Sequence, residues 1–267
     1  MIALARRDAA LRNDFWRQAV EIRREWLGVG FCTEPADRQV TEEAIASIYH
    51  RRPEFVWVDS PRAALPYLRG LPSHEDLRSW VASRRPAGRP PVASDIAAGL
   101  SFLRSTAEET YAEPPADRAS PKRKKGEGWP VLPPERALEL GLPFKEILTQ
   151  GVRDALFRTF SAFYLPVRAA LGVPPPVGWY GQQDGWWIAY LDVLRRLGLA
   201  APKASGELGA WEALARSAGW WWPGDDRCVL VERPARVRLK PVPGSWHDEL
   251  RLECVEYRDG WSVTGVL

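Results

Sequence analysis

The sequence predicts an α+β protein that is mostly helical and carries a small antiparallel β-sheet at its C-terminal end. Three observations lead to this fold class. Apolar residues recur at helical spacing through most of the chain, residues 178–199 are apolar on nearly every face, and residues 228–267 alternate apolar and charged side chains. Because no internal repeat interrupts this order, we expect one tryptophan-rich domain over residues 1–267.

Residues 178–199, GWYGQQDGWWIAYLDVLRRLGL, are expected to form the central helix of the core. Helical spacing places Trp187, Leu191, Leu194 and Gly198 on one stripe and Trp186, Tyr190, Val193 and Leu197 on a second stripe beside it. The narrow polar edge consists of Asp184, Asp192, Arg195 and Arg196. A helix with so little polar surface must be buried, and the rest of the chain is expected to pack around it.

Two amphipathic helices and a strand are predicted in the N-terminal part of the chain. Residues 14–27 keep apolar residues at helical spacing, and a second helix is expected from Thr33, an N-cap residue type, to a stop before Pro53. The short apolar run 55–58, FVWV, reads as a buried strand. A helix should follow it, capped by Asp59 or Ser60, with Pro61 in its first turn.

Further helices are predicted over residues 73–84, 94–112, 135–141, 144–171 and 210–218, the fourth of them broken or bent near Pro166. Residues 113–130 contain prolines and lysines but almost no core-forming side chains, so we expect a mobile insertion there. The C-terminal residues should form a hairpin or a three-stranded meander around the turn signal Asp259-Gly260.

The overall composition narrows the class of protein. With 45% hydrophobic and 27% charged residues the chain can form a core, and 37 basic against 34 acidic residues give a net charge of only +3, too weak to indicate a polyanion partner. Three cysteines without a C-x-x-C pair argue against a disulfide framework and indicate a reducing, cytoplasmic location. Because no run approaches about 18 apolar residues, we expect no membrane partner.

Five short segments stand in this order along the chain: TEPADR (33–38), VWVDSP (56–61), Gln183-Asp184, ERP (232–234) and YRDGW (257–261). Together they resemble an uncharacterised bacterial family. The family is a domain of unknown function common in actinobacteria and cyanobacteria, and the resemblance implies one continuous domain from Asp14 onward with residues 113–130 as an insertion. It implies no activity. The chain departs from the family pattern at residues 244–247 and 252–254, where relatives have a glycine-rich turn ending in Leu-His and a Gly-Pro-Ala strand.

Cofactor and metal sites are not indicated by the sequence. The histidines His50, His74 and His247 have no helical i, i+4 partner, and His247 with Asp248 and Glu249 is a poor ligand set because adjacent strand residues point to opposite faces. A P-loop or Rossmann glycine pattern is also absent from the sequence. We therefore expect no cofactor and no metal.

A non-catalytic binding or regulatory module that recognises another macromolecule, a protein partner first of all, is the favoured function. The first alternative is an enzyme whose site contains Asp184, Gln183, Asp59 and Arg38, polar residues at helix ends. The second is nucleic-acid binding through the basic run of Lys122, Arg123, Lys124 and Lys125. An enzyme predicts a cleft where those carboxylates converge, whereas a binding module predicts an exposed aromatic patch.

Overall fold

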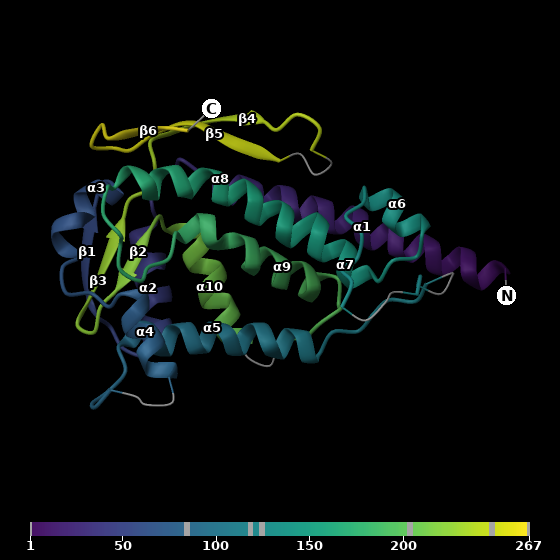
Figure 1. Cartoon of the computed structure of the whole chain (residues 1–267), viewed down its shortest axis with the longest axis horizontal. Helices are drawn as coiled ribbons and strands as arrows, with labels where there is room; N and C mark the ends of the chain where they lie inside the picture. The colour runs from purple at the N-terminus through teal and green to yellow at the C-terminus, as the bar shows by residue number, and fades with distance from the viewer. Residues whose placement is uncertain are drawn as a thin grey trace.

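The computed structural model describes residues 2–265 except 83–85, 117–119, 123–125, 202–204 and 246–248, and it describes the backbone alone for residues 2–9 and 205. Long helices run side by side along the molecule, one small sheet closes the end far from the N-terminus, and a second sheet lies along α8 (Figure 1). The predicted α+β class, mostly helical with an antiparallel sheet near the C-terminus, is confirmed.

The described helices are α1 (Ile2–Gly30), α2 (Arg38–Tyr49), α3 (Pro61–Ala64), α4 (His74–Val81), α5 (Val92–Glu109), α6 (Pro134–Glu139), α7 (Phe144–Leu148), α8 (Ala155–Ala170), α9 (Gly185–Arg196) and α10 (Ser205–Ser217). Two 3₁₀ segments, η1 (Leu65–Tyr67) and η3 (Gly181–Asp184), and one π-helical segment, η2 (Thr149–Asp154), complete them. Among these described helices, none is both long and apolar enough to cross a lipid bilayer.

The first sheet pairs strands from distant parts of the chain in the order β1-β3-β2. β1 (Glu54–Val58) is parallel to β3 (Arg227–Val231), and β2 (Trp221–Pro223) is antiparallel to β3. The alternation of apolar and charged residues from residue 228 onward had predicted one C-terminal antiparallel sheet. This prediction is wrong for its first part, because β3 belongs to the β1-β3-β2 sheet. β3 is a buried, nearly continuous apolar strand, which suits the centre of a sheet covered on both faces.

The second sheet is the predicted three-stranded meander. β4 (Arg236–Pro241), β5 (Leu250–Glu256) and β6 (Ser262–Thr264) pair antiparallel in the order β4-β5-β6. The turn signal is confirmed, because Gly260 takes a positive φ of 82° and the backbone N–H of Tyr257 donates to the carbonyl of Trp261 at 2.8 Å. This sheet packs on α8.

Two apolar cores meet at α8. Phe160 faces the larger core, which α9 crosses, whereas Phe163 and Val167 face the smaller core between the two sheets. Of the break or bend predicted near Pro166, the break does not occur: α8 continues through this residue, because its long apolar face packs against both cores. The row Trp220, Trp221 and Trp222 is 0–2% exposed, so these tryptophans fill the cores.

Capping chemistry fixes several element ends. Ser60 accepts a hydrogen bond from the Ala63 N–H at 3.1 Å and caps α3, so of the two predicted cap residues, Asp59 and Ser60, it is Ser60 that caps the helix. The second helix begins later than expected: Asp37, not Thr33, caps α2 by accepting from the Val40 N–H at 3.1 Å. Residues before Asp37 are held outside the helix by a contact of the Ala36 N–H with the carboxylate of Glu232.

The described parts of residues 113–130 contain no helix or strand. Both ends of the segment are packed: Glu113 accepts from the Lys145 N–H at 3.3 Å, and Trp129 lies half-buried against the larger core. The mobility expected for this insertion stays a prediction.

Candidate functional site

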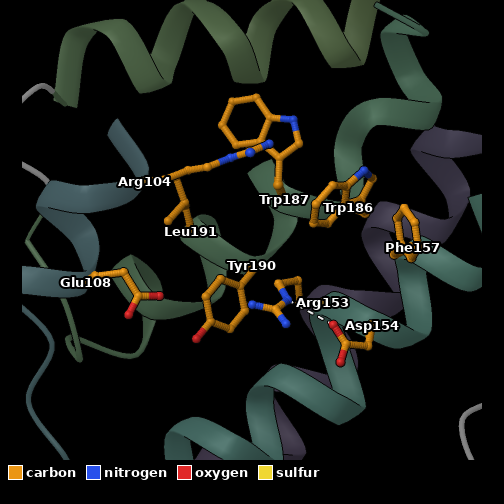
Figure 2. Close-up of a pocket in the computed structure, with 9 residues that line it drawn as sticks. All are labelled: Arg104, Glu108, Arg153, Asp154, Phe157, Trp186, Trp187, Tyr190 and Leu191. Carbon is orange, nitrogen blue, oxygen red and sulfur yellow. Dashed lines mark hydrogen bonds and ion pairs between the residues drawn. The ribbon is translucent and has the colours of Figure 1, made fainter. Parts of the chain in front are cut away.

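A pocket of about 330 Å³ lies between α5, η2, α8 and α9, and we call it the α5–α9 pocket. Figure 2 shows its lining: Arg104 and Glu108 from α5, Arg153 and Asp154 from η2, Phe157 from α8, and Trp186, Trp187, Tyr190 and Leu191 from α9. Its volume is at the lower end of the range for small-molecule sites.

Helical spacing explains which residues of α5 and α9 reach the pocket. Residues four apart lie one above the other on a helix, so Arg104 and Glu108 share a face of α5, and Trp186 and Tyr190 share a face of α9. The two predicted stripes of the central helix thus lie in different parts of the pocket. Trp187 and Leu191 are nearly covered and form the floor, whereas Trp186 stays half-buried at the wall.

The π-helical segment η2 supplies the two remaining charged groups. It interrupts the predicted helix over residues 144–171, and π-helical turns occur mostly as single bulges, often at functional sites. Gly151 is packed so closely on Trp16 that a Cβ atom there would lie 2.3 Å from the indole ring. This contact fixes the segment against α1, and the next residues, Arg153 and Asp154, line the pocket.

The aromatic walls pass from the surface into the core. Phe157 is 42% exposed and meets Trp186 edge-on, with ring centroids 5.1 Å apart. Trp187, only 3% exposed, packs edge-on against Trp211 at 5.3 Å, and the Tyr190 hydroxyl is 3.5 Å from the hydroxyl of Thr149. The pocket therefore has a rigid inner floor and an aromatic rim that solvent reaches.

Three of the four charged groups in the lining already have partners. Arg153 donates from Nε to the Asp154 carboxylate at 2.9 Å, and Glu108 forms an ion pair with Lys145. The Arg104 guanidinium instead lies over two indole rings, 5.5 Å from the centroid of Trp186 and 5.0 Å from that of Trp187. Within the described ranges no carboxylate or carbonyl accepts a hydrogen bond from Arg104.

Asp184, a predicted site residue, lies at the start of α9. Burial raises the pKa of its carboxyl group to about 6, against the opposing effects of a hydrogen bond from the Tyr180 N–H and the positive charge of Arg104. The hydrogen bond from Tyr180 is 2.8 Å long. Asp184 occupies the N-cap position of α9, but its side chain accepts a hydrogen bond from residue 180 and none from the N–H groups of the helix.

Gln183 is buried and links distant segments of the chain through hydrogen bonds. Its amide donates to the Gly30 carbonyl at 2.8 Å and its oxygen accepts from the Trp220 indole N–H at 3.2 Å. Both interactions tie η3 to α1 and to the Trp-rich strand region, and the side chain is 1% exposed. Both its amide nitrogen and its amide oxygen thus have a partner inside the protein.

Arg38 and Asp59 belong to a different neighbourhood. Arg38 stacks on Trp57 at 5.0 Å and forms an ion pair of 3.7 Å with Glu232, whereas Asp59 is exposed just after β1. In the described part of the chain, no hydrogen bond or ion pair joins Asp184 to Arg38 or to Asp59. The structure brings only Gln183 and Asp184 together, as neighbours on η3.

The segments that carry the family resemblance do meet, and they meet through internal contacts. Glu232 accepts from the Ala36 N–H at 2.5 Å, Ser60 donates to Asp259 at 2.6 Å, and Arg258 donates to the Thr33 carbonyl at 2.8 Å. These bonds join the TEPADR, VWVDSP, ERP and YRDGW segments at the carboxyl end of β1 and β3. The motifs therefore hold elements of the fold together.

The basic run and the histidines give little further information. Lys122 is exposed, whereas Arg123, Lys124 and Lys125 lie outside the described residues, as do His247 and Asp248. In the ranges that the structure covers, no group of three or more His, Cys, Asp or Glu side chains is placed to hold a metal ion. Nucleic-acid binding through the basic run stays a prediction.

Sequence reasoning missed Arg104, Arg153 and Phe157 as candidate site residues. Trp186 and Tyr190 could have been found, because both lie on the aromatic stripe predicted for the central helix. The fit of Arg104 to those rings had no local signal, since it depends on how α5 packs against α9. Compared with protein-family models, with curated proteins and with solved structures, the chain gives no match in any of the three.

Proposed function

We propose that the protein is a non-catalytic binding module that recognises another macromolecule by accepting an apolar, side-chain-sized group in the α5–α9 pocket. The observation that carries this proposal is the aromatic rim of Phe157 and Trp186 over a cavity of about 330 Å³. Exposed aromatic surface beside a preformed hollow is typical of recognition sites. A hollow of this size suits one inserted group and leaves most of a macromolecular partner outside.

The chemistry of the lining favours binding over catalysis. The described residues around the pocket include no serine, cysteine, histidine or lysine, and their acid–base groups are the carboxylates of Glu108 and Asp154 and the Tyr190 hydroxyl. Both carboxylates are already paired, Glu108 with Lys145 and Asp154 with Arg153. What remains is an apolar surface and the Arg104 guanidinium, which donates no hydrogen bond within the described residues and interacts electrostatically with the buried Asp184 carboxyl group.

A cytoplasmic location forms part of the proposal. All three cysteines, Cys32, Cys228 and Cys254, are free thiols, the state that a reducing compartment maintains. Burial also raises the pKa of the Cys228 thiol, which keeps that group protonated and unreactive.

One observation favours an enzyme as the second candidate. A carboxyl group with a pKa of about 6, such as that of Asp184, can exchange a proton near neutral pH. Its carboxylate already accepts a hydrogen bond from the Tyr180 N–H, and Asp184 does not line the pocket, so it is a weaker basis for a function than the pocket itself. Loss of a turnover activity in a folded Asp184→Asn protein would favour this candidate over the first.

The binding proposal can be tested with 3-phenylpropanamide, an uncharged probe that carries one ring. NMR signals of the tryptophan indole N–H groups should show a saturable shift for Trp186, and the variant Trp186→Ala should lose that binding. Phe102→Ala is the matched control, because Phe102 lies on α5, is 53% exposed and does not line the pocket. Unchanged affinity in Trp186→Ala, or no saturable shift at millimolar probe, would contradict the proposal.

A further inference from the structure

We infer that the group bound in the α5–α9 pocket carries a carboxylate close to its ring, and that Arg104 is the residue that pairs with this carboxylate. The inference rests on the proposed function and names the chemistry of its ligand: an aromatic monocarboxylate. Two sources share this chemistry, a free aromatic acid and the C-terminal aromatic residue of a protein.

The charge balance of the pocket points to Arg104. Arg153 is bound by Asp154 at 2.9 Å, and Glu108 is bound by Lys145. Arg104 is exposed and finds no acceptor among the residues that the structure describes. A guanidinium group has five N–H donors, so this residue offers unused donors at the mouth of an apolar hollow.

The geometry of Arg104 suits a carboxylate. Figure 2 shows the side chain extending from α5 across the pocket to Trp187, and the guanidinium carbon lies 5.0 Å and 5.5 Å from the Trp187 and Trp186 ring centroids. Stacking uses the flat face of a guanidinium and leaves its in-plane donors free. Those donors form the two-pronged arrangement that carboxylates bind most strongly, and the indole rings fix it in advance.

The remaining lining selects the rest of the ligand. Trp186, Tyr190 and Phe157 offer ring surfaces against which a phenyl or indole group packs, and the cavity of about 330 Å³ has room for such a ring and one carboxylate. The carboxylates of Glu108 and Asp154 lie on the same lining. They would repel a doubly charged phosphate more than a singly charged carboxylate, which favours the monoanion.

Calorimetric titration of the full chain with 3-phenylpropionate and with its uncharged amide, 3-phenylpropanamide, tests the inference. The acid should bind at least about tenfold more tightly than the amide, because the charge-assisted pair with Arg104 is added to the same ring contacts. In Arg104→Met, which keeps the apolar stem over the indoles, the acid should lose this advantage while the amide binds as before. Arg158→Met is the matched control and should keep the preference, since Arg158 lies on α8, pairs with Glu249 and does not line the pocket.

Equal binding of acid and amide to the wild type would overturn this inference and leave the proposed function standing. Absence of binding by both probes would overturn the proposed function as well. Benzyl phosphate binding more tightly than 3-phenylpropionate would also overturn the choice of a carboxylate. A tetrapeptide ending in Phe, compared with its amidated form, assigns the source. Preference for the free carboxylate at an affinity at least equal to that of 3-phenylpropionate supports a protein C-terminus. Weaker binding supports a free acid and would contradict the macromolecular partner of the proposed function.

Discussion

The carboxyl group of Asp184 is buried, and burial disfavours its charged form. Burial raises its pKa from 3.8 to about 6, although the Tyr180 N–H and the charge of Arg104 both favour the ionised form. A carboxyl group whose pKa is raised in the folded state stabilises the fold fully below its unfolded pKa and loses this contribution as pH rises through the folded pKa. Asp184 should therefore weaken the fold between about pH 4 and pH 6 as it ionises.

Asp184→Asn should remove this loss, because the amide oxygen still accepts from Tyr180 and no charge has to be buried. We expect the variant to melt at a higher temperature than the wild type at pH 8 and to lose that difference at pH 4, as measured by thermal unfolding across the range. Asp76→Asn is the contrasting control. Hydrogen bonds from Ser73 lower the pKa of Asp76, so loss of the Asp76 charge should weaken the fold at pH 8.

The neighbouring indoles Trp186 and Trp187 should separate binding from stability. Trp187 is 3% exposed and packs on Trp211, so Trp187→Ala should cost about 3–5 kcal/mol of unfolding free energy, a large part of the roughly 5–15 kcal/mol of a typical domain. Trp186 is half-buried at the rim, and Trp186→Ala should cost clearly less while abolishing probe binding. Urea unfolding of both variants measures the difference, and equal losses would show that the rim is structural.

At the scale of elements, the helical run from α7 through η2 to α8 depends on one small residue. Gly151→Ala would place a methyl group 2.3 Å from the Trp16 ring, so we expect a loss of about 1–3 kcal/mol from overpacking. Gly99→Ala in α5 is the control, because nothing lies within 4 Å of the added methyl group. That change should be neutral or stabilise by up to about 1 kcal/mol, as alanine does in helices.

The same substitution should also affect the pocket, because Arg153 and Asp154 follow Gly151 in η2. Probe binding by Gly151→Ala should weaken even at temperatures where the protein is folded. A second change that makes room, Trp16→Leu, should restore part of the lost stability when combined with Gly151→Ala. Full additivity of the two losses in denaturant unfolding would contradict the close contact between residues 16 and 151.

The residue types at helix ends predicted many helices, but not the late start of α2 or the π-helical segment η2. Ser60 followed by Pro61 is a helix start that depends on adjacent residues only, and the structure confirms it. Thr33 had the same chemistry, yet the long-range contact of Ala36 with Glu232 delays the helix to Asp37. The π-helical segment had no recognisable signature, because its extra residue is stabilised by packing against α1.

At the scale of the whole molecule, Glu232 connects segments far apart in sequence. Its buried carboxylate accepts from the N–H groups of Ala36 and Arg233 and pairs with Arg38. Glu232→Ala should cost about 1–3 kcal/mol for each donor left without an acceptor. Glu253 is exposed, and Glu253→Ala should change the unfolding free energy by less than about 0.5 kcal/mol. Equal losses of unfolding free energy in the two variants would argue against a stabilising role of the Glu232 hydrogen bonds.

The candidate site was harder to predict than the fold because its parts come from four elements. Trp186 and Tyr190 were placed on the right helix from their spacing alone, but their role depends on Arg104 and Phe157, which reach them from α5 and α8. Gln183 and Arg38 attracted attention as polar residues at helix ends. The structure shows that Gln183 serves the interior and that Arg38 pairs with Glu232, interactions that no local pattern reveals.

Because β1 pairs with β3, which follows much later in the sequence, β1 leaves the ribosome long before its partner strand. Glu54 of β1 pairs with Arg227 of β3, and translation at about 5–20 residues per second leaves roughly 10–35 s between the two strands. During that interval the apolar sequence FVWV has left the ribosome without the partner strand that it pairs with in the finished sheet. Unpaired apolar strands join strands of other chains, so slow synthesis of the second half should favour aggregation of the first.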